Sequence, residues 1–322
     1  MWDFSFRTSL GLVARTFPFV LLRLAVYLGI AFFYVLATGL GIGAGWGIGS
    51  AFDDGALTGA ALGGFVGFFT VAGVLWWVRA YILYLVKAGH VAALDARLRG
   101  LELPAGQGQI GYATGMVKAR FVEVNLLFGL DVLLRGAIAA LVGLAGMLLF
   151  WVPDGGQLAR FFHAVLRISL GLVDEVILAY IIRHGEAAPG ESARDGLVLY
   201  AQNAGMLLKN GIWIALMEYA LAILIFLLLL SPAIGLAYAM PGGLTGFGVA
   251  FAAVLAWSLK RALIEPVSIA CLLQAYDRAI AGQVPDPQWT ARLDGASAAF
   301  REMAGRGDAR RGAPWQSGAA TG

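Results

Sequence analysis

The chain has 322 residues, of which 60% are hydrophobic and only 13% are charged, and its mean hydropathy is +0.78. Soluble domains have about half apolar and about a quarter charged residues, so this composition excludes an ordinary soluble globule. The formal charge of +3 comes from basic residues dispersed between apolar runs rather than gathered on one face, and we therefore expect no nucleic-acid partner.

Long apolar runs recur along the chain, and each has about the 20 residues needed to cross the hydrocarbon core of a bilayer. The runs lack the period-two polarity of barrel strands. They therefore predict an all-α, polytopic helical membrane protein, because only helices and closed barrels satisfy the backbone in lipid. The six predicted transmembrane helices cover residues 24–50, 56–78, 130–152, 159–182, 207–231 and 244–266.

An amphipathic stretch precedes the first, third and fifth of these spans, and the three stretches resemble one another. They begin at Gly11, Gly115 and Gly196, and each continues through a large apolar residue and Val to a Leu-Leu pair. This pattern indicates three hairpin units, each with a cytoplasmic interfacial helix and two spans. The alternative is a coincidence of the kind that any apolar chain contains.

Two rows of glycine at four-residue spacing flank the first turn, and the rows mirror each other about Asp53. If the chain turns back at Asp53, the glycines of the two rows meet and the helix backbones approach closely. This pattern resembles the glycine-zipper transmembrane hairpin of membrane proteins that pack or oligomerise through such rows. The resemblance covers residues 39–67 only, and its expected packing residues are Gly39, Gly43, Gly47, Gly59, Gly63 and Gly67.

A further row, Gly41, Gly45 and Gly49, lies on another side of the first span. We expect it to contact a further helix or another subunit, and packing within the chain and an oligomer seam stay as alternatives. The closely spaced glycines of "GLGIGAG" are also found in dinucleotide-binding loops. No strand precedes them and no acidic partner follows, so that interpretation is rejected.

The fourth span carries a polar stripe, because residues spaced by three, four and seven share one face of a helix. Glu175 lies beside the stripe, about 100° round the helix. Ionisable residues in spans cost about 2.5 to 3.5 kcal/mol each at a helix centre, so they indicate an interior face or a wet cavity. The stripe either lines a solvated path or fixes the helix through buried pairs with Glu218 or Asp131. Its members are Arg160, His163, Arg167 and Asp174.

Other ionisable residues lie near the predicted inner ends of the spans. Asp131 with Arg135 and Arg261 with Glu265 are i,i+4 pairs that can neutralise each other locally. Pro266 is expected to kink the sixth span, and kinked helices form ion and substrate sites in transporters. The candidate residues for a cavity or polar network are therefore Arg160, His163, Arg167, Asp174, Glu175, Glu218, Asp131, Arg135, Arg261 and Glu265.

The C-terminal region differs from the transmembrane domain, which we place at residues 1–282. Residues 283–304 predict an amphipathic cytoplasmic tail helix, with Asp286 as its cap and Pro287 in its first turn. Residues 305–322 are rich in glycine and polar residues and are expected to be a disordered tail.

The short Gly- or Pro-rich links at residues 52, 153 and 231 contain no Lys or Arg, whereas basic residues gather at the opposite ends of the spans. By the positive-inside rule, this asymmetry predicts a multi-pass protein of the inner (plasma) membrane with both termini in the cytoplasm.

The motifs of catalysis are missing from the sequence. The three histidines are scattered, the single Cys271 forms no cluster, and there is no nucleophile elbow or P-loop. We therefore expect no enzyme activity, no cofactor and no bound metal. The single cysteine also excludes a disulfide within the chain.

Two functions remain compatible with this sequence. In the first, the charged residues line a cytoplasm-facing polar cavity, and the protein is a transporter or channel-like pathway for a small solute, ion or lipid. In the second, it is a structural or assembly protein that packs against partner subunits or shapes the bilayer through its glycine rows and interfacial helices. The expected partners are the lipid bilayer and either a second copy of the chain, as a homo-oligomer, or a partner membrane protein.

Overall fold

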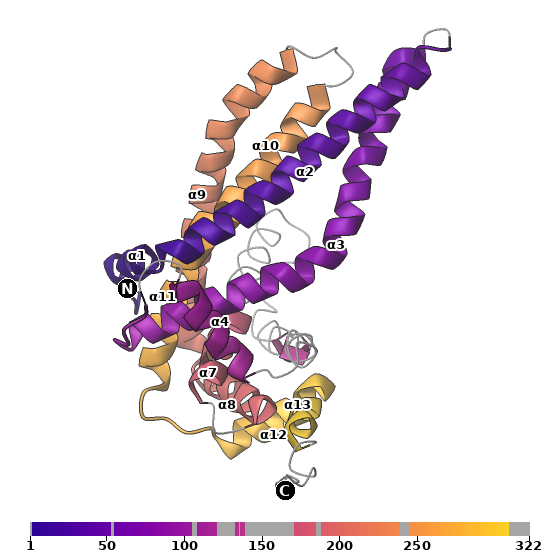
Figure 1. The fold of residues 1–322 in the computed structure, drawn as a ribbon. Coiled ribbons are helices and arrows are strands. Elements are labelled where there is room, and N and C mark those ends of the chain that lie inside the picture. The colour runs from indigo at the N-terminus through magenta and orange to yellow at the C-terminus, as the bar shows by residue number, and fades with distance from the viewer. Residues whose placement is uncertain are drawn as a thin grey trace, which may run out of the picture. The chain divides into compact units, whose positions relative to one another are not determined.

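Helices account for all the regular secondary structure that is described in the computed structural model (Figure 1). No β-strand occurs within the described ranges, so the all-α prediction is confirmed for this part of the chain. The described residues are 2–52, 55–104, 108–120, 133–134, 136–138, 171–184, 188–238 and 245–308.

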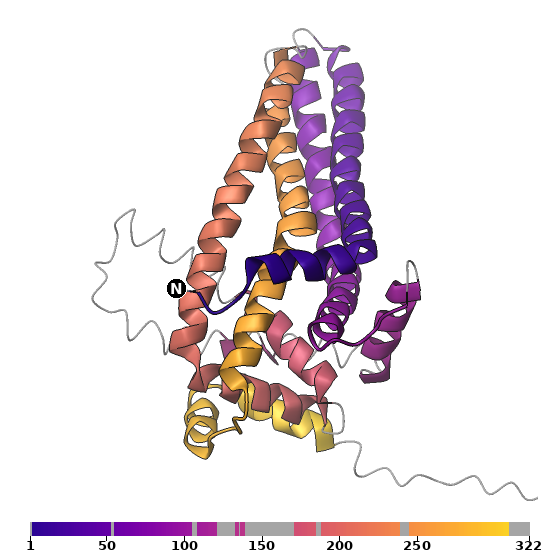
Figure 2. The same cartoon turned by 90° about the vertical axis from the view of Figure 1, so that its left-hand side faces the viewer.

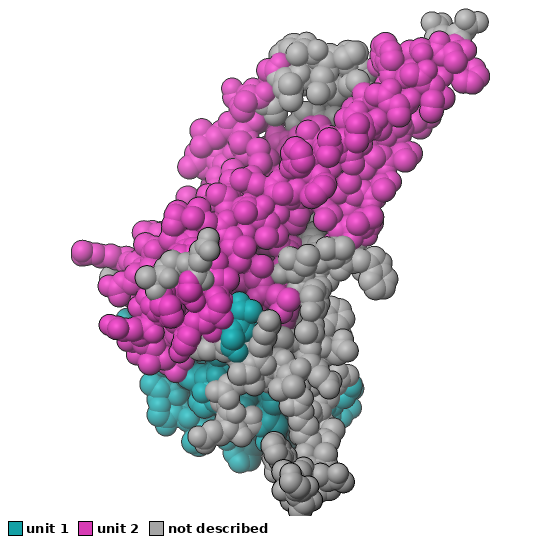
Figure 3. Space-filling view, viewed as in Figure 1, with its two compact units in different colours: residues 1–5, 113–213, 271–322 teal, residues 6–112, 214–270 magenta. Residues whose placement is uncertain are grey.

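The chain divides into two compact units (Figure 3). Both units are assembled from segments that are far apart in the sequence. Unit 1 comprises residues 1–5, 113–213 and 271–322, and unit 2 comprises residues 6–112 and 214–270. The predicted boundary at residue 282 between a transmembrane domain and a tail stays a prediction.

Unit 2 is built around long helical segments that lie side by side in both views (Figures 1 and 2). These are α2 (Phe17–Gly49), α3 (Gly55–Leu98), α10 (Thr245–Leu259) and the part of α9 (Ala204–Tyr238) that follows residue 213. The remaining elements of the unit are α1 (Phe6–Arg15), the start of α4 (Gly108–Arg120), the π-helical segment η2 (Lys260–Ile264) and the start of α11 (Glu265–Ile280).

Three helical segments are long and apolar enough to cross a membrane, namely Phe17–Gly49, Gly55–Leu75 and Ala204–Pro232. They correspond to the first, second and fifth predicted spans. The sixth predicted span is helical through α10, η2 and the start of α11. Most of the third span and the first half of the fourth lie outside the described residues. The structure is therefore compatible with insertion in a membrane.

Two short helices lead into long apolar helices through junctions of the same geometry. Thr16 separates α1 from α2 with φ −106° and ψ 24°, and Asn203 separates α8 (Pro189–Gln202) from α9 with φ −108° and ψ 18°. The Thr16 hydroxyl donates to the Leu12 carbonyl at 3.0 Å, and the Asn203 amide donates to the Leu199 carbonyl at 2.9 Å. Both side chains thus satisfy a carbonyl of the last turn of the short helix.

Helices α2 and α3 pack backbone against backbone near the turn that joins them. A Cβ placed on any glycine of this contact would overlap a carbonyl oxygen of the facing helix, so no side chain fits at these positions. Such close approach adds van der Waals contact between helices in lipid. The facing pairs are Gly41 with Gly63, Gly45 with Gly59, Gly49 with Gly55, and Ala37 with Gly67.

The predicted packing row of α2 is therefore wrong, whereas the row Gly59, Gly63 and Gly67 of α3 is in contact as predicted. A Cβ on a residue of the predicted α2 row would meet nothing within 4 Å. The pairs are centred on Phe52 rather than Asp53, and this moves each partner in α2 by two residues, about 200° round the helix. The glycines of α2 that take no part in the contact are Gly39, Gly43 and Gly47.

Unit 1 has a core of short helices in which α8 is central. The Tyr276 hydroxyl of α11 donates to the Gly196 carbonyl of α8 at 3.0 Å, and Arg194 of α8 pairs with Asp294 at 2.9 Å. The guanidinium of Arg194 also lies 4.4 Å from the ring centre of Phe300. The helices packed on α8 are α7 (Val173–Arg183), α12 (Pro287–Ala296) and α13 (Ala298–Asp308).

The predicted tail helix over residues 283–304 is observed as two helices, α12 and α13. Asp286 caps the first, because its carboxylate accepts from the Gln288 N–H at 2.7 Å. Ser297 interrupts the helix in an extended conformation, and its hydroxyl accepts from the Phe300 N–H at 3.2 Å. Ser297 thereby caps the second helix, a signal that the helical spacing of apolar residues conceals. Residues 309–322 of the predicted disordered tail lie outside the described residues.

Candidate functional site

A buried carboxylate on α11 is surrounded by three cations from three other segments of unit 2. Arg23 of α2 lies 3.4 Å from Oε1 of Glu265, and Lys87 of α3 lies 3.6 Å from the same oxygen. Arg261 of η2 contacts Oε2 at 2.8 Å. Only 2% of the Glu265 side chain is exposed, so these charges interact with little screening by water. One carboxylate therefore holds α2, α3 and η2 together.

The π-helical turn η2 precedes Glu265 directly, and Pro266 gives a local reason for it. Proline has no N–H, so Pro266 cannot donate to the carbonyl of Ala262 four residues before it. The Glu265 N–H instead bonds to the Lys260 carbonyl, five residues back. Single π-turns of this kind occur often at functional sites. The predicted effect of Pro266 is thus seen as a change of helical hydrogen bonding at the charged residues.

A second ion pair, between Lys260 of η2 and Glu218 of α9, lies beside the first group. The side chain of Glu218 is only 4% exposed. Among the described residues, the two groups contain four cations and two carboxylates, which is an excess of two positive charges. We call this set the cation cluster; its members are Arg23, Lys87, Lys260, Arg261, Glu218 and Glu265.

Arg23 is the most deeply buried cation of the cluster, with a side chain that is 1% exposed. Its Nη2 lies 3.4 Å from Oε1 of Glu265, and its guanidinium also interacts with the Tyr27 side chain. Because it is shielded from water, its charge acts on neighbouring groups with little screening. Arg23 therefore adds positive charge to the interior of the cluster.

Aromatic rings lie next to the cluster on the side of the apolar helices. The rings of Tyr27 and Trp257 meet edge to face, with centroids 5.5 Å apart. The guanidinium of Arg261 lies 5.8 Å from the ring centre of Trp257. Tyrosine and tryptophan favour the boundary between lipid and water, because each has an apolar ring and a polar group. The pair thus separates the charged residues from the aliphatic part of the same helices.

His90 of α3 is a buried titratable residue near the cluster. Its Nε2 lies 3.1 Å from the Thr16 hydroxyl, and its ring stacks on Phe19 with centroids 5.3 Å apart. Because the Thr16 hydroxyl already donates to a carbonyl, we assign the proton of the neutral ring to Nε2. Burial, and then the positive charge of Arg23, hold the pKa of His90 well below its ordinary value. His90 is therefore neutral near pH 7.

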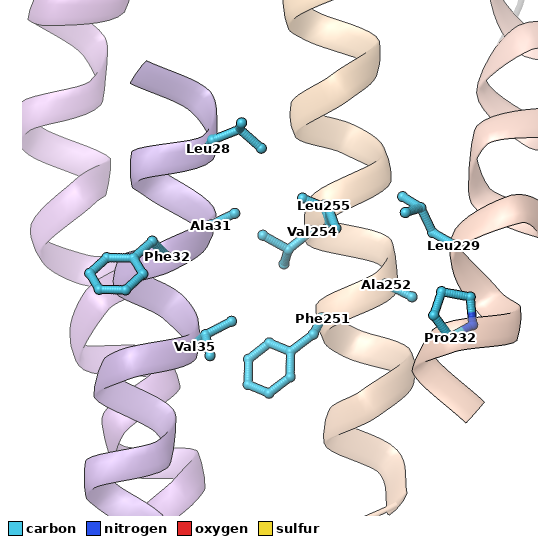
Figure 4. A pocket seen from close by; sticks show the side chains of 10 residues that line it. All are labelled: Leu28, Ala31, Phe32, Val35, Leu229, Pro232, Phe251, Ala252, Val254 and Leu255. Atoms are coloured by element: carbon cyan, nitrogen blue, oxygen red, sulfur yellow. The ribbon is translucent and has the colours of Figure 1, made fainter. Parts of the chain in front are cut away.

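A cavity of about 330 Å³ lies between α2, α9 and α10 in unit 2 (Figure 4). Its walls extend from Leu28 to Val35 on α2 and from Phe251 to Leu255 on α10, with Leu229 and Pro232 on α9. Every lining residue is apolar. This volume lies within the range of about 300 to 1,000 Å³ that is typical of ligand pockets.

The candidate residues of the predicted polar network are distributed over both units. Glu218, Arg261 and Glu265 lie in the cation cluster of unit 2, and the predicted i,i+4 pair of Arg261 with Glu265 is present. Asp174 and Glu175 are in the first turn of α7 in unit 1, where Glu175 is buried. The remaining predicted residues lie outside the described residues; they are Arg160, His163, Arg167, Asp131 and Arg135.

Three cations of the cluster, Arg23, Lys87 and Lys260, were not among the candidate residues predicted from the sequence. The predicted first span began at residue 24, which placed Arg23 outside it. Helix α2 begins instead at Phe17, so Arg23 lies within the apolar helix. An arginine inside an apolar run is itself a signal for an interior charge, and extending the span by two turns would have revealed it.

Comparison of the chain with protein families, with curated proteins and with solved structures finds no match. Within the described residues, no three side chains of the metal-binding types gather closely enough to hold a metal ion.

Proposed function

We propose that this chain is a multi-pass protein of the inner membrane whose cation cluster forms part of a pathway for a small solute, ion or lipid. The observation that carries the proposal is the burial of Arg23, Glu218 and Glu265 between apolar helices, where they pair with three partly buried cations. Such charges are costly within a membrane protein, and by default they mark a path or a binding site for a polar group. The proposal requires no catalysed reaction, cofactor or metal.

The proposed topology has six spans in three hairpins, with both termini in the cytoplasm. It is supported by the close contact of α2 with α3 and by the turn between them, which lacks Lys and Arg. The basic residues of the cluster lie near the opposite ends of the same helices, as the positive-inside rule requires of a cytoplasmic end. The cluster would then face the cytoplasm.

Liposomes containing the purified protein test the pathway directly. Release of potassium, release of glycerol and transfer of a fluorescent phospholipid between leaflets are measured against empty liposomes. We expect one of these probes to move faster, and we expect Glu218→Gln and Arg261→Gln to slow that movement because both residues belong to the cluster.

Glu102→Gln is the matched control, because Glu102 is exposed in a loop and its substitution changes the charge equally. It should leave the movement of every probe unchanged. The pathway proposal fails if no probe moves faster than in empty liposomes, or if both cluster variants retain the full rate.

Cysteine labelling tests the topology. Ser50→Cys places a thiol in the exposed turn after α2, and Ala298→Cys places one at the exposed start of α13. The native Cys271 is buried and provides the background. A membrane-impermeant maleimide should label Ser50→Cys in intact cells and Ala298→Cys only after lysis. The reverse pattern would overturn the proposed orientation.

An assembly role is the second candidate, and the outer face of α2 favours it. Gly39, Gly43 and Gly47 are exposed and have open space where a Cβ would be, beside the exposed Leu40 and Trp46. Rows of small residues allow helices of different chains to approach closely. A stable oligomer that Gly43→Leu dissociates would support this role, whereas a monomer in mild detergent would argue against it.

A further inference from the structure

We propose that unit 2 binds an anionic phospholipid of the bilayer, with the phosphate beside the cation cluster and an acyl chain in the apolar cavity. This inference rests on the function proposed above, because it names the ligand class of the same cluster. It is carried by the order of side chains along two helices, by the excess of positive charge and by the composition of the cavity wall.

Along α2, the side chains change from charged to aromatic to aliphatic in the direction of the turn. Arg23 belongs to the cluster, Tyr27 follows one helical turn later, and Leu28 begins the wall of the cavity. A phospholipid has the same order, from its phosphate through its ester groups to its acyl chains. The Tyr27 hydroxyl lies at the level where the ester oxygens would accept a hydrogen bond.

The segment formed by η2 and α10 repeats this order. Arg261 belongs to the cluster, Trp257 lies one turn away, and Leu255 and Phe251 line the cavity. At 1.5 Å per residue, the cavity wall begins about 9 Å from Arg261 and continues to about 15 Å. The hydrocarbon layer of one leaflet is about 15 Å thick, so a chain anchored at the cluster would reach the whole cavity.

The charge of the cluster selects an anionic ligand. Among the described residues, its four cations exceed its two carboxylates. The side chain of Arg261 is 36% exposed, so it is accessible to a headgroup. The buried Arg23 would act on the headgroup only through the electrostatic attraction of its charge. A zwitterionic lipid, with no net charge, would gain less.

The cavity selects a hydrocarbon chain. Its lining is apolar throughout, and Leu28, Phe32 and Val35 on its α2 wall are exposed at the surface of the unit. Figure 4 shows Leu28 and Val35 of α2 directed toward α10, and Phe251 of α10 directed toward α2. Apolar cavities exclude water and accept apolar ligands, so an acyl chain entering from the bilayer would fill the space.

Native mass spectrometry of the full-length protein in detergent tests the inference. The protein is incubated with equal amounts of phosphatidylglycerol and phosphatidylcholine that have the same acyl chains. We expect one phosphatidylglycerol to be retained with a preference of at least about fivefold, the effect of roughly one basic contact with an anionic lipid. Equal retention of the two lipids would overturn the inference.

Substitutions locate the site. Ala252→Leu places a larger side chain in the cavity wall and should reduce retention at least about fivefold, because the space for the acyl chain is filled. Ala253→Leu is the matched control on the exposed face of the same helix. Arg261→Gln should remove the preference for phosphatidylglycerol, whereas Arg292→Gln in unit 1 should retain it. Equal effects of the two alanine substitutions would overturn the inference.

The lipid inference and the pathway proposal can be overturned separately by these two experiments. If phosphatidylglycerol is retained as expected but no probe moves, the lipid site is supported and the pathway proposal fails. If a probe moves and Glu218→Gln slows it, but the preference for phosphatidylglycerol is missing, the lipid inference alone is overturned. Size-exclusion profiles of each variant identify misfolded protein, and Ala252→Leu leaves every charge of the cluster in place.

Discussion

The two ends of the α2–α3 pair are held together in opposite ways. Near the turn, glycine backbones of the two helices touch directly and no side chain lies between them. At the other end, Arg23 and Lys87 extend from the two helices to a carboxylate that neither helix supplies, Glu265. The first contact is complete within the two helices, whereas the second needs a residue that follows Lys87 by 178 positions in the sequence.

The two kinds of contact differ in whether they can form before the other segments of the unit are in place. Glycine contacts gain dispersion energy from close approach and require no counter-charge. A buried ion pair offsets its cost of desolvation only when all its partners are in place. The glycine end can therefore assemble as soon as α2 and α3 meet, and the charged end is completed only when η2 and α11 join them.

The largest effect is expected from removing the shared carboxylate. Glu265→Gln leaves Arg23, Lys87 and Arg261 without their buried counter-charge, which should cost about 3 to 5 kcal/mol of stability. Thermal or denaturant unfolding in detergent measures the loss, with the exposed Glu102→Gln as control. A Glu265→Gln protein as stable as the control would refute the view that this carboxylate holds the charged end together.

The glycine end should respond to the face that is substituted. Gly45→Leu directs a side chain into the Gly59 backbone and should destabilise the protein by about 1 to 3 kcal/mol through overpacking. Gly43→Leu is the matched variant two residues away, where the space is open. It should gain up to about 1 kcal/mol from helix propensity. If the two variants unfold at the same temperature, the assignment of the contact face is wrong.

A smaller effect is expected on the pH dependence of stability, to which the charged end should contribute and the glycine end should not. Because the pKa of His90 is lowered in the folded protein, the unfolded chain takes up a proton near pH 6.5 that the folded protein does not. The stability is complete above that pH and should fall by up to about 1.4 kcal/mol for each unit of acidification below it.

His90→Phe keeps a ring against Phe19 but cannot titrate, so it should lose this share of the pH dependence. The measurement is the slope of unfolding free energy against pH in both proteins. Gly43→Leu should retain the slope of the unsubstituted protein. An unchanged slope in His90→Phe would show that His90 does not contribute to it.

Local features of the sequence predicted several parts of the fold. The all-α class followed from composition and from apolar runs without period-two polarity, and the Asp286 cap followed from its position before Pro287. The pair of Arg261 with Glu265 followed from i,i+4 spacing. Each of these depends on residues within about one helical turn of each other, or on averages over a whole segment, so no tertiary information was needed.

The predictions that failed or remained incomplete concerned the rotation of a helix about its axis and the residues at which helices begin and end. A shift of the turn centre from Asp53 to Phe52 moved the glycine contact from the row of Gly43 to the row of Gly45. Placing the start of the first span at residue 24 hid the role of Arg23. The Ser297 break of the tail was concealed because apolar residues continue at helical spacing across it.

Composition and apolar periodicity were enough to predict an all-helical, strongly apolar chain with glycine rows and a few ionisable residues inside its long helices. Which glycine row is in contact, and which three cations share Glu265, became known from the packing of the helices. The physical reason is that hydropathy and helical spacing are properties of single segments. Contacts between segments depend instead on the rotation of each helix about its axis, which the turns and the packing of the other helices set together.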